Sequence, residues 1–175
     1  MSEPQLRVAI ALGSNLQDRD ALLRDGVAAI AGIDSVWLVA LSQVEETEPI
    51  GPPQPLYLNQ MVLVETVLPM PVLLGQLQAI EMRHGRDRSI IRGPRTLDLD
   101  IVWADAAIVT SAELLIPHPG LTTRSFWQRE LAELLGVDAA AEAIAAAQVH
   151  AGIDTSERNI AKRDARWSGG WDIVA

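Results

Sequence analysis

Apolar residues along this chain fall into short runs that predict strands and helices in turn. Residues 7–12, RVAIAL, form a compact apolar run of the kind found in buried strands, and Gly13-Ser14-Asn15 closes it. Residues 18–32 then place leucine, valine and isoleucine at helical spacing. The chain is therefore predicted to open with a strand that is followed by a helix.

Further along, β-forming residues gather in two more segments. Residues 35–46 and 57–68 are both rich in them, and the prolines of 47–55 exclude regular structure from the loop between. Residues 71–85 begin with proline, end with glycine and carry apolar residues at helical spacing, which predicts a second helix. Residues 96–103, TLDLDIVW, alternate between apolar and polar positions as a strand does.

The resulting order, β-α-β-β-α-β, predicts an α+β fold. It is the arrangement of a ferredoxin-like sandwich, in which an antiparallel sheet carries its helices on one face. A further helix is expected at 125–135, and an alanine-rich helix at 138–151. We expect 1–136 to form the main domain and 137–175 to be a helical C-terminal extension of that domain.

Composition narrows the classes of protein to consider. With 175 residues and 49% hydrophobic content, the chain is long enough for one domain with a real core. The net charge of −9 argues against a nucleic-acid partner, which requires a broad basic surface. The chain has no cysteine, no secretory signal and no apolar run of bilayer length. We therefore expect a cytoplasmic protein, monomeric and without a membrane partner.

Basic charge is concentrated in one segment of this acidic chain. Thirteen of the 14 basic residues are arginine, and five of them lie between 83 and 95. Arginine presents a planar fork of donors suited to phosphate, so the cluster points to a small phosphorylated ligand. A solvated charged loop is the structural alternative.

Two carboxylates follow the arginines on the predicted strand 96–103. Alternation directs Leu97, Leu99 and Ile101 to the core and places Asp98 and Asp100 on the other face, about 7 Å apart. Two carboxylates this close require a counter-charge. A divalent cation shared with phosphate oxygens would supply it, and so would the nearby arginines.

Several segments together resemble a known family. They are IALGSNL at 10–16, TEPIGPPQPLYLNQMVLVET at 47–66, QAIEMRHGR at 78–86, RGPRTLDLDIV at 92–102 and IPHPGLTTRSF at 116–126. In this order they resemble the 6-hydroxymethyl-7,8-dihydropterin pyrophosphokinases of the folate pathway, over roughly residues 7–136.

The resemblance implies transfer of pyrophosphate from ATP to the hydroxymethyl group of the pterin, with release of AMP. It implies two Mg²⁺ ions held by Asp98 and Asp100, and phosphates held by Arg86 and Arg95. The positions that match the family's pterin site are Thr47, Ile50, Tyr57, Asn59 and Phe126. Those that match its nucleotide side are Gln78, Glu81, His118 and Arg124.

Other interpretations of these residues stay open. Asparagine is disfavoured in strands, which favours a ligand role for Asn59, whereas Tyr57 and Phe126 are also compatible with an ordinary core. A P-loop kinase is excluded, because the single lysine, Lys162, is followed by arginine. A ligand-binding domain without chemistry and a two-metal phosphoesterase are the competing functions, and an assay of AMP release separates all three.

Overall fold

The structure is a computed structural model that describes residues 5–86, 89, 92–105 and 107–153. Its strands are β1 (Leu6–Ser14), β2 (Val36–Leu41), β3 (Glu45–Thr47), β4 (Tyr57–Thr66), β5 (Asp98–Ala104), β6 (Val109–Thr110) and β7 (Leu115–Ile116). The α-helices are α1 (Arg19–Ala31), α2 (Met70–Arg83), α3 (Ser125–Leu135) and α4 (Val137–Ala147). Two short 3-10 helices are η1 (Pro119–Thr122) and η2 (Gln148–His150).

An antiparallel sheet in the order β2-β4-β1-β5 forms the centre of the molecule, and β3 pairs with β4 beside it. The predicted α+β class is confirmed. The segment 35–46, predicted as one strand, forms two, β2 and β3, which both pair with β4. Between them the Ser42 hydroxyl accepts a hydrogen bond from the Met61 N–H at 2.9 Å, so a side chain replaces a regular ladder contact there.

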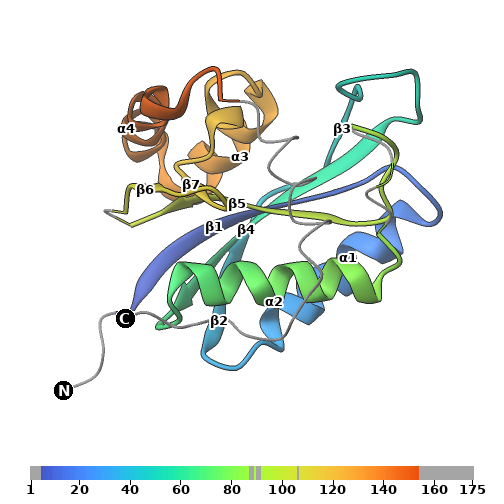
Figure 1. The fold of residues 1–175 in the computed structure, drawn as a ribbon, viewed down its shortest axis with the longest axis horizontal. Coiled ribbons are helices and arrows are strands. Elements are labelled where there is room, and N and C mark those ends of the chain that lie inside the picture. Colours follow the sequence, from blue (N-terminus) through green and yellow to red (C-terminus); the bar gives the residue numbers. More distant parts are fainter. Residues whose placement is uncertain (1–4, 87–88, 90–91, 106, 154–175) are drawn as a thin grey trace.

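Helices cover both faces of this sheet (Figure 1). The helices α1 and α2 pack on one face, where Ile10, Leu77 and Ile101 belong to the larger hydrophobic core. The helices α3 and α4 pack on the other face, where Met61 and Trp127 belong to a second core. The expectation of helices on one face therefore holds for α1 and α2 alone, and the C-terminal helices add a third layer.

Local sequence explains where the first two helices begin and end. The Asp18 side chain accepts a hydrogen bond from the Ala21 N–H at 3.0 Å and so caps the N-terminus of α1. In α2, Pro71 occupies the first turn, where its missing N–H costs nothing, and the chain leaves the helix at Gly85 with φ +75°. None of the described helices combines the length and the apolar character needed to cross a bilayer.

The alanine-rich segment predicted as an extension is part of the fold. Ala140, Ala143 and Ala147 of α4 are buried in the second core, where small side chains allow α4 to approach α3. After α4, His150 is buried in η2 and its ring bonds the Thr110 hydroxyl and the Pro117 carbonyl, both at 2.8 Å. The predicted extension beyond Ile153 lies outside the described residues.

Candidate active site

A cavity of about 370 Å³ lies on the α3 and α4 side of the sheet. Its floor comes from β1, β4 and β5, and its sides come from the loop after β3, the η1 segment and the start of α3. Ten of the thirteen predicted site residues line it, namely Thr47, Ile50, Tyr57, Asn59, Arg95, Asp98, Asp100, His118, Arg124 and Phe126.

Strand register places a predicted pterin-site residue, Asn59, and a predicted metal ligand, Asp98, on the same cavity floor. Asn59 of β4 and Asp98 of β5 both pair with Gly13 of the central strand β1. The three residues form one cross-strand row, which spans about 10 Å at the usual spacing of strands. A Cβ atom on residue 13 would lie only 3.2 Å from Asn59 Oδ1, so glycine keeps the floor open between them.

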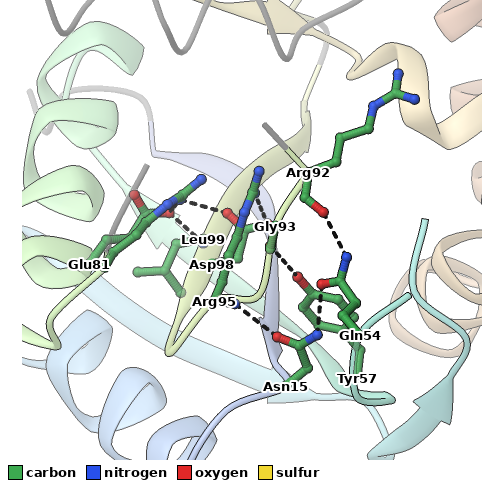
Figure 2. Close-up of polar contacts among 10 residues, drawn as sticks. Asn15, Gln54, Tyr57, Glu81, Arg92, Gly93, Arg95, Asp98 and Leu99 are labelled. Carbon is green, nitrogen blue, oxygen red and sulfur yellow. Dashed lines mark hydrogen bonds and ion pairs between the residues drawn. The ribbon is translucent and has the colours of Figure 1, made fainter. Parts of the chain in front are cut away.

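Asp98 is held from both sides by arginine. Its Oδ2 is 2.7 Å from Arg95 Nη1, and its Oδ1 is 2.6 Å from Arg86 Nη1. Arg86 also pairs with Glu81. The Glu81 carboxylate accepts a hydrogen bond from the Leu99 N–H at 2.7 Å, and Figure 2 shows Glu81 and Leu99 beside Asp98. The charge of Asp98 raises the pKa of Arg95, which stays fully charged.

Asp100 follows Asp98 on the same face of β5 and has a different environment. Burial, together with repulsion from Asp98, raises the pKa of Asp100 to about 6. A divalent cation near this pair would relieve both effects, because it offsets the repulsion and solvates the carboxylates. Among the described residues, no group of three or more His, Cys, Asp or Glu side chains is arranged to hold a metal.

Asn15 positions the loop that carries Arg95. The Asn15 Oδ1 accepts a hydrogen bond from the Arg95 N–H at 2.8 Å, and the Asn15 N–H donates to the Arg95 carbonyl at 3.1 Å. Its Nδ2 donates to Gln54 Oε1 and to the Pro55 carbonyl, both at 2.9 Å, and Gln54 Nε2 donates to the Arg92 carbonyl (Figure 2). One buried amide thus joins three loops around the site.

The β4 end of the cavity combines polar and aromatic side chains. Asn59 Nδ2 donates to the Thr47 hydroxyl at 2.6 Å, which fixes the orientation of the amide. Burial, with a contribution from the charge of Asp98, raises the pKa of Tyr57 to about 12, so its phenol stays neutral. Phe126 packs its edge against Trp127, with 6.3 Å between ring centroids. A flat ring with polar edges would find matching partners here.

The opposite end is built on η1 and the start of α3. The guanidinium of Arg124 lies 4.2 Å from the centroid of Trp127, and the His118 ring meets the same indole edge-on at 5.0 Å. Burial and the charge of Arg124 lower the pKa of His118 to about 3, and its neutral Nδ1 accepts from the Gly120 N–H at 2.9 Å. Arg124 therefore supplies a fixed positive charge, and His118 supplies none.

Three predicted residues lie outside the cavity lining. Gln78 is half-buried on α2, and Glu81 on the same helix is only 1% exposed because its carboxylate is used by Arg86 and Leu99. Arg86 lies just beyond α2, with its side chain buried between Glu81 and Asp98. Glu81 thereby links α2 to β5, and Arg86 extends this link to Asp98.

Sequence reasoning missed other residues of the site. Ala11 and Gly13 form the floor, and Gly152 and Ile153 line the cavity from the C-terminal side. The strand predicted at 7–12 places Ala9 and Ala11 on one face, since every second residue of a strand shares a face, and this could have indicated Ala11. The sequence offered no comparable signal for Gly152 and Ile153.

Comparison with known proteins gives related sequences for most of the chain. Residues 9–136 match the family described as 7,8-dihydro-6-hydroxymethylpterin-pyrophosphokinase. A 2-amino-4-hydroxy-6-hydroxymethyldihydropteridine pyrophosphokinase of Bacillus subtilis is 39% identical over 126 residues, which cover 71% of this chain and 75% of that protein. The protein of the same name from Pseudomonas aeruginosa is 37% identical over 129 residues, which cover 73% and 80%. The folic acid synthesis protein fol1 of Pneumocystis carinii is 37% identical over 130 residues, 74% of this chain and 17% of that protein.

Proposed function

Since the chain belongs to the 7,8-dihydro-6-hydroxymethylpterin-pyrophosphokinase family, we propose which of its residues bind each substrate and the metal. The protein is an enzyme of folate biosynthesis that transfers pyrophosphate from ATP. The acceptor is the hydroxymethyl group of the dihydropterin, and AMP is the second product. The observation that carries the proposal is the row Asn59–Gly13–Asp98, which joins an amide suited to a heterocycle to a carboxylate suited to a phosphate-bound cation.

The pterin is assigned to the β4 end of the cavity. Asn59, oriented by Thr47, faces the polar edge of the ring, and Tyr57 and Phe126 contact its faces. Ile50 closes the site from the loop after β3. A buried amide that pairs with the ligand discriminates strongly, because a molecule lacking that edge leaves polar atoms unpaired.

Asp98 and Asp100 are assigned to Mg²⁺, two ions in our proposal. Both line the cavity from one face of β5, and carboxylate oxygens together with phosphate oxygens are the ligands that Mg²⁺ prefers. A cation held by these carboxylates would supply positive charge that neutralises the phosphates. The chain's own contribution is to fix the two carboxylates, and ion pairs with Arg86 and Arg95 fix Asp98.

The arginines are assigned to the triphosphate. Arg95 lines the cavity, its backbone is fixed by Asn15, and its planar fork suits the oxygens of a transferring phosphoryl group. Arg124 extends the positive charge toward η1, beside the neutral His118. Gln78 and Glu81 belong to the nucleotide side through α2, where Glu81 acts by holding Arg86 and β5. No covalent nucleophile is needed, since positioning and charge carry this class of reaction.

Release of AMP is the direct test, measured with ATP and Mg²⁺ in the presence and absence of hydroxymethyl-dihydropterin. We expect pterin-dependent AMP. A binding domain without chemistry would release none, and a phosphoesterase would release inorganic phosphate without the pterin.

A pair of lysine variants tests the role of the arginine fork. Arg95→Lys keeps the charge but loses the bidentate geometry, so kcat should fall at least 100-fold, about 2.7 kcal/mol. Arg7→Lys is the control, because Arg7 pairs with Asp105 on the surface, away from the cavity, and its kcat should stay within twofold. Equal activity of the two variants would contradict the assignment of Arg95.

A further inference from the structure

The last residues that the structure describes form one side of the cavity. Gly152 and Ile153 line it together with His118 and Arg124, although they follow α4 and η2 in the chain. The match to the family ends at residue 136, so this side of the cavity is built by a segment outside the shared region.

The segment is held in place by buried contacts. His150 is 1% exposed and its two ring nitrogens bond Thr110 and Pro117, the residue that precedes His118. The chain then turns at Gly152, with φ +80°, and the Ile153 N–H donates to the His150 carbonyl at 3.2 Å. The position of Ile153 is therefore tied to the same strand end that carries His118.

The neighbours of this segment are those of the proposed phosphate end. The 3-10 helix η2 contacts η1, which lies between His118 and Arg124 in the chain, and both of these residues line the cavity. The pterin end, with Thr47 and Asn59, lies on β3 and β4 instead. An apolar side chain that lines the same cavity as Arg124 would exclude water from bound phosphates and so strengthen their attraction to the guanidinium.

We propose that Ile153 is a further nucleotide-binding residue, which forms an apolar wall against the nucleotide co-substrate. The proposal rests on the proposed function, since it assigns the η1 end to ATP. If Ile153 has this role, the segment from α4 to Ile153 contributes to nucleotide binding, although it lies beyond the residues that match the family.

The absence of cysteine from the chain allows a clean labelling test. In the Ile153→Cys variant the single thiol would line the cavity, and a bound nucleotide should shield it from iodoacetamide. Val149→Cys is the control, because Val149 lies on η2 only four residues earlier but is 63% exposed and outside the cavity lining. With Mg²⁺ and a non-hydrolysable ATP analogue, labelling should slow at least tenfold at position 153 and less than twofold at position 149.

A second pair of variants tests the wall by size. Ile153→Trp narrows the η1 end, so KM for ATP should rise at least tenfold while kcat stays within threefold. Val149→Trp should leave both constants unchanged. A fall in kcat at unchanged KM would overturn the wall, since it would place Ile153 in the chemistry or in the fold instead of in nucleotide binding.

The possible outcomes separate the two proposals. If the wild-type protein binds the analogue by calorimetry but position 153 is not protected, or does not react even without nucleotide, the wall is overturned and the proposed function stands. If the wild-type protein neither binds the analogue nor releases AMP, the proposed function is overturned. The role proposed for Ile153, which rests on that function, is then overturned as well. Selective protection at 153, combined with the KM effect, supports the inference.

Discussion

The two faces of the central sheet are built from the same strands but have opposite characters. On β1, Val8, Ile10 and Leu12 point toward α1 and α2, whereas Ala9 and Ala11 point toward α3 and α4. On β5, Leu99 and Ile101 belong to the first core, and Asp98 and Asp100 line the cavity. A period of two thus lets one strand contribute stability on one face and chemistry on the other.

Buried charge also differs between the faces. On α2, the Glu81 carboxylate pairs with Arg86 and accepts a hydrogen bond from the Leu99 N–H. On the cavity face, Asp100 has a raised pKa, and Glu130 of α3 is buried with neither carboxylate oxygen hydrogen-bonded to any described residue. The face that carries the cavity is therefore the one that holds charge at a cost in stability.

The largest expected effect comes from neutralising the cavity face of β5. Asp100→Asn should lower kcat at least 1,000-fold, about 4 kcal/mol, because a carboxylate assigned to Mg²⁺ is lost. Its thermal stability without Mg²⁺ should be unchanged or higher at pH 7.5, since burial penalises the ionised Asp100 in the folded state. Asp105→Asn, at the surface pair with Arg7, is the control and should retain its turnover. More than a tenth of wild-type turnover in Asp100→Asn would refute the metal assignment.

Substitution of Leu99, which precedes Asp100, should lower stability and leave substrate binding unchanged. Leu99→Ala removes a buried side chain that packs in the first core, so the free energy of unfolding should fall by about 3 kcal/mol. Below the melting transition, KM for the pterin should stay within threefold, because the side chain points away from the cavity. Urea denaturation and steady-state kinetics at 15 °C measure the two effects. A loss of pterin affinity without a loss of stability would contradict the assignment of stability to one face of the sheet and of binding to the other.

The buried carboxylate of Glu130 allows the comparison between the two faces to be tested through the pH dependence of stability. Burial, and secondly the charge of Glu45, raises the pKa of Glu130 to about 8 from an ordinary value of 4.5. Between these values the unfolded chain loses the proton while the folded protein keeps it, so the free energy of unfolding falls as pH rises through this window.

Removing the titration should therefore stabilise the protein at high pH. Glu130→Gln should gain about 2 kcal/mol at pH 9 and almost nothing at pH 4, after allowance for a buried amide without a partner. Glu142→Gln, exposed on α4, is the control and should show the wild-type pH dependence. Urea titrations at both pH values decide this, and a gain of the same size at pH 4 would rule out the titration of Glu130 as its cause.

The smallest expected effect concerns the floor of the cavity. In Gly13→Ala the new Cβ would lie 3.2 Å from Asn59 Oδ1 and 3.4 Å from the Tyr57 ring, so both must shift slightly. Pterin affinity should fall about tenfold, near 1.4 kcal/mol, while affinity for an ATP analogue stays within twofold. Gly75→Ala on α2, where a Cβ meets no atom within 4 Å, should leave both affinities unchanged. Calorimetric titration of each ligand distinguishes these cases.

Alternation was the most informative sequence signal. It placed Leu97, Leu99 and Ile101 in the core and Asp98 and Asp100 on the opposite face, as the structure shows. Strand pairing then brought Asn59 to the same row, which no local pattern encodes because β4 and β5 meet only through β1. The resemblance of the motifs supplied this long-range information.

Other features depend on tertiary context that a single sequence does not display. Glu81 was expected to match the family's nucleotide side, and its ion pair with Arg86 and its bond to the Leu99 N–H arise only from the packing of α2 beside β5. The break near Ser42 arises from a side chain that bonds across to β4. Alanine in α4 indicated a helix by propensity, yet only packing against α3 determines which face of the sheet that helix covers.

The amide of Asn15 has a consequence for how the molecule becomes active during synthesis. It lies 39 residues from Gln54 and 80 residues from Arg95 along the chain, so each of its contacts closes a long loop. A nascent chain that has emerged only as far as β4 contains Asn59 and Tyr57 but none of the arginines and aspartates that line the cavity. Recovery of turnover on refolding should therefore coincide with the docking of β5 onto β1, the step that completes both the sheet and the loop junction at Asn15.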